Sequence, residues 1–243
     1  MKIRKLFACL LFYCVFSISL FSEAVSFFTS SKPDLSASYT LAHSLRNDLR
    51  TEPFMFENTF RADFKELRID CGFSVQNSKI DFTSGIDYLP KFFGFFRGGF
   101  GFRHHVYRYV GKFTENDLFL SACLEWCKTD FFTAELAGGA AFKFAAIDAL
   151  QEVKPVIFNC CPFLEVKANF LITPELNAYA SFASYDYFDY PLFATPYFKT
   201  GLGYRFDKSC AIDCSVTLKF VDMITSAVYL NDCIIRTALK VYF

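Results

Sequence analysis

Beyond its first 24 residues, the chain has no hydrophobic run long enough to form a membrane-spanning helix. Such a helix needs about 20 consecutive apolar residues, and charged residues interrupt each of the longer apolar stretches here. The best candidate, residues 134–150, contains Glu135, Lys143 and Asp148. Helical membrane spans are therefore excluded from this part of the chain.

The chain also has no excess of charge of either sign. Its 25 Lys and Arg residues balance 25 Asp and Glu residues, so the formal net charge is zero and the pI is about 6.8. A nucleic-acid-binding domain usually carries a basic field. A nucleic acid is therefore not expected as a partner.

Residues suited to catalysis or metal binding are few and badly spaced. The chain has only 3 histidines, and the adjacent His104 and His105 would point to opposite faces of a strand. On a strand, Cys123 and Cys127 would lie about 13 Å apart, too far to share one metal ion. The sequence predicts no catalytic residue, no metal site and no cofactor, and an enzyme is not expected.

What the chain has instead is high hydrophobicity. It is 53% hydrophobic, contains 34 Phe and has a mean hydropathy of +0.25, although 21% of its residues are charged. In a bilayer every backbone N–H and C=O must be bonded within the protein, which only helices and closed β-barrels achieve. With helical spans excluded, this composition favours a barrel.

The N-terminus has the pattern of an export signal. Lys2, Arg4 and Lys5 form a basic region, residues 6–21 form an apolar core, and the small residues Ser22 and Ala24 fit cleavage after Ala24. We expect residues 1–24 to be a signal peptide that is removed, and residues 25–34 to be a short periplasmic lead-in. The alternative is an uncleaved anchor, for which the apolar core is short.

The last eleven residues alternate strictly between two kinds of side chain. Phe243, Val241 and Leu239 lie on one face of the predicted strand, and Lys240 and Arg236 lie on the other. This ending resembles the closing strand of small bacterial outer-membrane β-barrel proteins, either porin-like or closed. The resemblance implies that Leu239, Val241 and Phe243 form the assembly signal read by the barrel-assembly machinery. It also implies a location in the outer membrane, in contact with its lipid.

The same alternation recurs along the whole chain after residue 34. It predicts twelve strands, mostly of the length that a tilted transmembrane strand needs. The predicted segments are 35–41, 54–64, 67–75, 79–88, 96–107, 118–126, 132–144, 156–170, 176–182, 198–206, 212–220 and 233–243.

Loop lengths alternate as well. Counted back from the C-terminus, residues 222–231, 185–191, 145–155 and 109–116 would be long outer loops, separated by short turns. Barrels of this kind have short periplasmic turns and longer outer loops, and their strand number is even. We predict an all-β, antiparallel, up-and-down transmembrane barrel of about twelve strands. Ten strands are the alternative, if the first two segments form a periplasmic extension.

The apolar face of these strands could in principle fill a soluble barrel instead of facing lipid. A small barrel interior holds few large side chains, and the chain has 34 Phe to place. A lipid-facing apolar exterior with aromatic girdles accommodates them. The membrane barrel is therefore the preferred interpretation.

The polar face of the strands then lines the lumen, and it carries more basic than acidic residues. Rings of charge would give a narrow aqueous pore a mild anion preference, whereas paired charges would plug it. The candidates are Arg61, Asp63, Arg68, Asp70, Arg97, Arg103, Glu125, Glu135, Lys143, Glu165, Lys167, Lys199, Arg205, Asp213, Lys219, Arg236 and Lys240.

The sequence thus predicts a small outer-membrane pore for polar solutes. The alternative is a closed barrel that acts as an adhesin or a structural membrane protein through its outer loops. Both hypotheses use the same strand pattern and differ only in how the lumen is packed.

Overall fold

A computed structural model describes eight segments of the chain. They are residues 33–45, 54–76, 79–109, 113–129, 131–147, 156–184, 196–221 and 229–243. The expected signal peptide, residues 1–24, and most of the expected lead-in lie outside the described residues. Among the described residues, no helix is long and apolar enough to cross a membrane.

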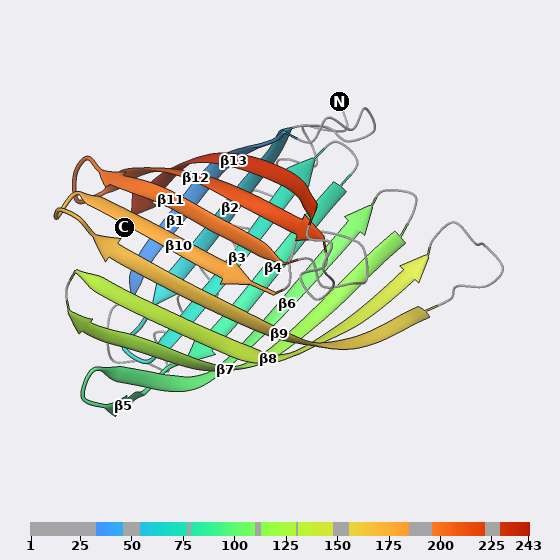
Figure 1. The fold of residues 1–243 in the computed structure, drawn as a ribbon, viewed down its shortest axis with the longest axis horizontal. Helices are drawn as coiled ribbons and strands as arrows, with labels where there is room; N and C mark the ends of the chain where they lie inside the picture. The colour runs from blue at the N-terminus through green and yellow to red at the C-terminus, as the bar shows by residue number, and fades with distance from the viewer. Residues whose placement is uncertain are drawn as a thin grey trace.

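The described residues form thirteen strands in one antiparallel sheet (Figure 1). The strands are β1 (Asp34–Ser44), β2 (Phe54–Asp63), β3 (Leu67–Gln76), β4 (Lys79–Tyr88), β5 (Lys91–Phe93), β6 (Phe96–Tyr109), β7 (Phe113–Thr129), β8 (Phe132–Ile147), β9 (Val156–Leu171), β10 (Leu176–Ala183), β11 (Tyr197–Arg205), β12 (Cys210–Val221) and β13 (Tyr229–Tyr242).

Twelve of these strands close into a barrel. Each strand pairs with its sequence neighbour, and β1 pairs with β13 over nine residue pairs, from Ser36–Tyr242 to Ser44–Ile234. The short β5 pairs only with the start of β6, and β4 pairs directly with β6, so β5 lies outside the ring. The wall therefore has no free edge, which satisfies the backbone groups of every strand. The twelve-strand prediction is confirmed, and the ten-strand alternative is wrong.

Short turns gather at the end of the barrel that carries the C-terminus (Figure 1). Their backbones are bonded locally: the Ile172 N–H donates to Leu176 O at 2.8 Å, and the N–H of Cys210 donates to Asp207 Oδ1 at 2.7 Å. At the other end, the predicted outer loop 109–116 is wrong. β7 already begins at Phe113, which pairs with Tyr109, so Thr114, Glu115 and Asn116 belong to the wall.

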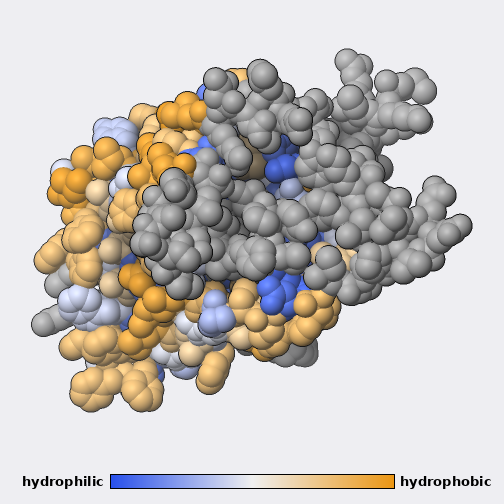
Figure 2. Space-filling model, turned by 45° about the vertical axis from the view of Figure 1, so that its right-hand side comes forward, coloured by the Kyte–Doolittle hydropathy of each residue, from blue (hydrophilic) through white to orange (hydrophobic). Residues whose placement is uncertain are grey.

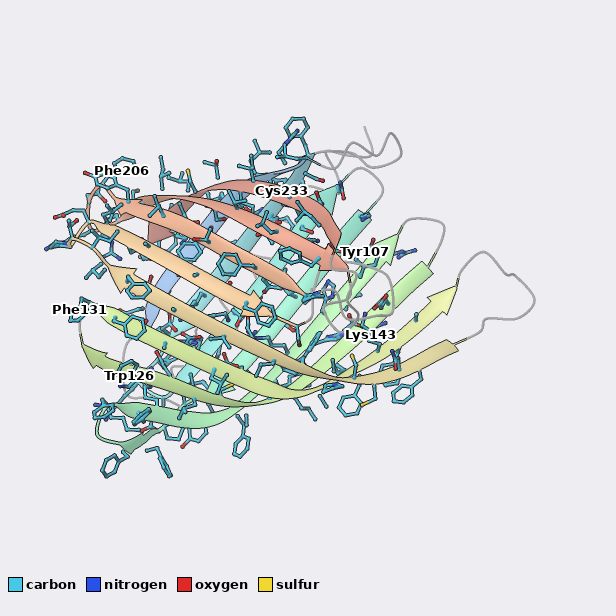
Figure 3. All side chains as sticks on the ribbon, in the orientation of Figure 1. Tyr107, Trp126, Phe131, Lys143, Phe206 and Cys233 are labelled. Carbon is cyan, nitrogen blue, oxygen red and sulfur yellow. The ribbon has the colours of Figure 1, made fainter. Side chains whose placement is uncertain are left out.

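The outer face of the wall is apolar. Phe100 is 74% exposed, Phe158 57% and Leu41 54%, although none lies in a loop. Figure 2 shows apolar side chains predominating over the described exterior on one side of the molecule. In Figure 3, Trp126, Phe131 and Phe206 lie near the end with the short turns, and Tyr107 and Lys143 lie toward the opposite end. Large hydrophobic residues thus predominate on the outer face of the wall, the reverse of a soluble barrel.

Candidate functional site: the barrel lumen

Side chains from β3, β4, β6 and β7, with facing parts of β8 and β9, fill one side of the lumen. We call this the filled side. It contains a small apolar cluster of Phe119, Ala141 and Phe163, in which the two rings meet edge-to-face at 5.5 Å between centroids. The sequence does not predict an inward-facing apolar cluster, because these positions lie on the face that alternation assigns to polar residues.

Arg68 is the centre of an ion-pair network on the filled side. Its guanidinium lies 3.3 Å from Asp63 Oδ1, 3.3 Å from Glu135 Oε2 and 3.7 Å from Glu125 Oε1. Arg97 reaches the other oxygen of Glu125 at 3.1 Å. The arrangement shares two cations among three carboxylates, so each charge lies against an opposite one.

A second network continues along the same side. Arg103 lies 3.5 Å from Asp87 Oδ2 and 3.2 Å from Glu165 Oε2, and Lys167 Nζ approaches the same Glu165 oxygen at 3.1 Å. The cavity left between the networks has a volume of only about 20 Å³. That is room for about one water molecule, so this side of the lumen is closed by its own side chains.

A third cluster lies toward the end of the barrel opposite the C-terminus. Lys143 is only 1% exposed, and its ammonium donates to Glu115 Oε1 at 2.9 Å and lies 4.0 Å from Asp117 Oδ2. His105 Nδ1 lies 3.6 Å from the same Asp117 oxygen. The cluster is almost fully buried, where an unpaired charge would be costly.

The opposite side of the lumen is hollow. A cavity of about 590 Å³, which we call the chamber, lies inside the wall formed by β1, β2 and β8–β13. Polar side chains that line it include Ser38, Thr59, Thr133, Asn169, Asn177, Tyr179, Ser181 and Ser215. Its charged lining comprises the cations Arg61, Lys167, Lys199, Arg236 and Lys240 and the anions Glu57, Asp63, Glu135, Glu165 and Asp213.

Two ion pairs join strands of the chamber wall near the seam where β1 pairs with β13. Arg236 Nε donates to both oxygens of Glu57, at 3.1 and 3.3 Å, and Arg236 Nη1 donates to Thr217 at 2.7 Å. Lys240 Nζ donates to Asp213 Oδ2 at 3.0 Å. These contacts join β2, β12 and β13 across the point where the barrel closes.

The remaining predicted lumen residues, Asp70, Lys219 and Arg205, line neither of these two cavities. The Asp70 carboxylate lies so close to Gly85 that a Cβ there would be 2.7 Å from Asp70 Oδ1. Lys219 is 4% exposed on β12. Arg205 lies over the Tyr242 ring, 4.6 Å from its centroid, at the end with the short turns.

Sequence reasoning missed five acidic residues that face the lumen, namely Glu57, Asp81, Asp87, Glu115 and Asp117. Glu115 falls within the predicted outer loop 109–116, and β4, which carries Asp81 and Asp87, has a weak pattern. The alternation of Asp81 and Asp87 with Phe82 and Ile86 is the signal in the sequence that could have identified these two acids as facing inward. These five acids offset the predicted basic excess, so charge number alone does not support an anion preference.

The predicted assembly-signal residues lie on the outer face beside the closing seam. Leu239 pairs with Tyr39, and Val241 pairs with Ala37. Phe243 is 74% exposed, and its N–H donates to Leu35 O at 3.0 Å. The terminal residues thus contribute to the seam through their backbone and leave their side chains outside.

The described strands and turns hold no group of three or more His, Cys, Asp and Glu side chains arranged to bind a metal ion. On the outer face, His104 Nε2 lies 3.4 Å from Asn116 Oδ1. Seven cysteines of the described strands are free thiols, namely Cys71, Cys123, Cys160, Cys161, Cys210, Cys214 and Cys233.

No protein-family model and no curated protein matches the sequence. Among solved structures, the chain is similar to the KdgM porin in complex with disordered oligogalacturonate, with a TM-score of 0.57 and 11% identity over 86% of this chain and 99% of that one. The NanC porin gives a TM-score of 0.56 and 10% identity over 86% and 99%.

An outer-membrane channel from Pseudomonas putida F1 gives a TM-score of 0.51 and 8% identity over 88% of this chain and 96% of that one. The fold of this chain is therefore that of bacterial outer-membrane porins, as the resemblance implied. At these identities the likeness concerns the fold.

Proposed function

We propose that this protein is a small pore for polar solutes in the bacterial outer membrane. The observation that carries the proposal is the chamber of about 590 Å³ lined by polar and charged side chains, inside a wall whose outer face is apolar. An apolar exterior suits lipid, and a wet, charged interior suits small hydrophilic solutes. The porin fold of the structural neighbours supports the same function.

In this proposal, solutes pass only along the side of the lumen that contains the chamber. The ion-paired networks of Arg68 and Arg103 occupy the filled side and narrow the passage, so the solutes are small. The filled side is also the one observation in favour of the alternative, a closed barrel that acts as an adhesin or a structural membrane protein. The two proposals differ in whether the chamber connects the two sides of the membrane.

Current through a planar bilayer separates them. Refolded protein inserted from detergent should give stepwise currents that grow with salt concentration. A control measurement on a gel should show that the inserted protein is folded, because a folded barrel migrates differently before and after boiling. A folded, inserted protein that stays silent would contradict the pore and support the closed barrel.

We further propose that the chain is exported with its signal peptide, residues 1–24, removed, and that the barrel-assembly machinery reads Leu239, Val241 and Phe243. Phe243→Ala should lower the amount of folded barrel in the outer membrane of cells. Refolding of the same variant in detergent should be unaffected, because the Phe243 side chain is 74% exposed. Equal amounts of wild-type and variant barrel in cells would contradict the role of this residue.

A further inference from the structure

The charges of the chamber pair almost completely with one another. Arg61 lies 2.6 Å from Asp63, Lys167 lies 3.1 Å from Glu165, and the Arg236–Glu57 and Lys240–Asp213 pairs were described above. The fifth acid, Glu135, lies 3.3 Å from Arg68 of the filled side. Each acid that lines the chamber is therefore matched to a cation.

Lys199 is the cation left over. Among the described residues no carboxylate forms an ion pair with it, and its contact is with the Tyr179 ring, whose centroid lies 5.7 Å from Lys199 Nζ. A cation–π contact at this distance is near the outer limit for such interactions and is weak. The half-buried Lys199 ammonium thus carries a positive charge into the chamber without a directly bonded counter-charge from the described wall.

Tyr179 is held as a fixed surface beside this charge. Its hydroxyl donates to Asp213 Oδ1 at 2.7 Å, which ties the ring across β11 to β12. The ring can cross there because residue 201 is Gly: a Cβ at that position would lie 2.6 Å from Tyr179 Cζ. Lys240 Nζ lies 5.9 Å from the same ring centroid while bonded to Asp213. The result is an immobilised aromatic ring with an ammonium free of carboxylate partners next to it.

We infer that Lys199 and Tyr179 form a binding site for a small solute that carries one anionic group on a ring. The anion would take the position opposite the Lys199 ammonium, and the ring would stack on Tyr179, as flat apolar faces do on aromatic side chains. This inference rests on the proposed pore function and names the class of solute. A neutral ring lacks the ion pair, and an anion without a ring lacks the stacking surface.

Block of single-channel current by added solutes tests the site in the full-length protein. The probes are glucuronate, which has a ring and a carboxylate, glucose, which has only the ring, and acetate, which has only the carboxylate. Glucuronate should block at the lowest concentration. Lys199→Gln should raise the apparent Kd for glucuronate about tenfold and leave that for glucose unchanged, because a charge-assisted contact is lost.

Lys167→Gln is the matched control, since Lys167 lines the same chamber and carries the same charge but is paired with Glu165. It should change the Kd for glucuronate by less than about twofold, because its charge is already matched within the wall. Gly201→Ala, which displaces the Tyr179 ring, should weaken glucuronate and glucose together. Tyr179→Leu should do the same without the added Cβ.

The possible results distinguish failure of the Lys199–Tyr179 site from failure of the pore. Currents that glucuronate blocks no better than acetate or glucose would overturn the site and leave the pore standing. A Kd for glucuronate that is equal in wild type and Lys199→Gln would also overturn it. Absence of any current would contradict the pore itself.

Discussion

The stability of the barrel should depend strongly on the charge of the buried Lys143. Lys143, Glu115 and Asp117 are 1%, 3% and 3% exposed respectively, and the single ammonium lies 2.9 Å from one carboxylate and 4.0 Å from the other. Lys143→Met keeps most of the length and apolar volume of the side chain and removes its charge. It leaves Glu115 and Asp117 buried without the ammonium, and breaking a buried ion pair in this way costs about 3–5 kcal/mol.

Urea unfolding in detergent micelles measures that cost, with the fluorescence of the single Trp as the signal. With a slope of about 2 kcal/mol per molar, the midpoint should fall by about 2 M. Lys167→Met is the control, because the Lys167 side chain is 38% exposed and Glu165 keeps Arg103 as a partner. It should cost less than about 1 kcal/mol. Equal midpoints for the two variants would contradict a stabilising role for the buried Lys143 ion pairs.

Two further predictions concern the wall. A Cβ on Gly139 would collide with the carbonyl of Leu120 on β7, whereas a Cβ on Gly138 would meet nothing closer than 3.6 Å. Gly139→Ala should therefore greatly lower the yield of refolded barrel, measured as heat-modifiable migration on a gel, and Gly138→Ala should not. Equal yields for the two variants would contradict the close approach of β7 and β8 at this point. Trp126 lies on the outer face of β7, and its ring centroid is 5.3 Å from that of Phe132. The fluorescence of Trp126 should be quenched strongly by brominated lipid and weakly by aqueous iodide. The opposite result would place this face of the barrel in water.

The sequence predicted the wall because each strand repeats one physical rule. Successive side chains of a strand point to opposite faces, so alternation such as Phe56 and Glu57 identifies a strand and its two environments without any tertiary information. This rule located all twelve wall strands. It failed at Glu115 and Asn116, where polar side chains in succession resembled a loop but continue β7 beyond the apolar part of the wall.

The division of the lumen could not be predicted from alternation. The pairs that create it join residues far apart in the chain, such as Arg68 with Glu135 and Arg236 with Glu57. Which charges meet depends on the register between strands and on the cross-section of the closed barrel, and alternation specifies neither. The list of inward residues was therefore largely available from the sequence, but their partners were not.

The position of Tyr179 illustrates the same limit. On sequence grounds it is one more polar-face residue of a predicted strand. Its role depends on the absence of a Cβ at Gly201 on the next strand and on Asp213 on the strand beyond. Both relations follow from the pairings of β10 with β11 and of β11 with β12.

Single-channel conductance of two matched variants shows whether solutes cross the barrel through the chamber. Ser38→Trp places a large ring into the chamber from β1, and Ala122→Trp places the same ring on the outer face of β7. We expect Ser38→Trp to lower the conductance by at least about half, since its indole would project into the cavity of about 590 Å³ through which solutes pass. Ala122→Trp should conduct like the wild type, and equal conductance for all three proteins would contradict a path through the chamber.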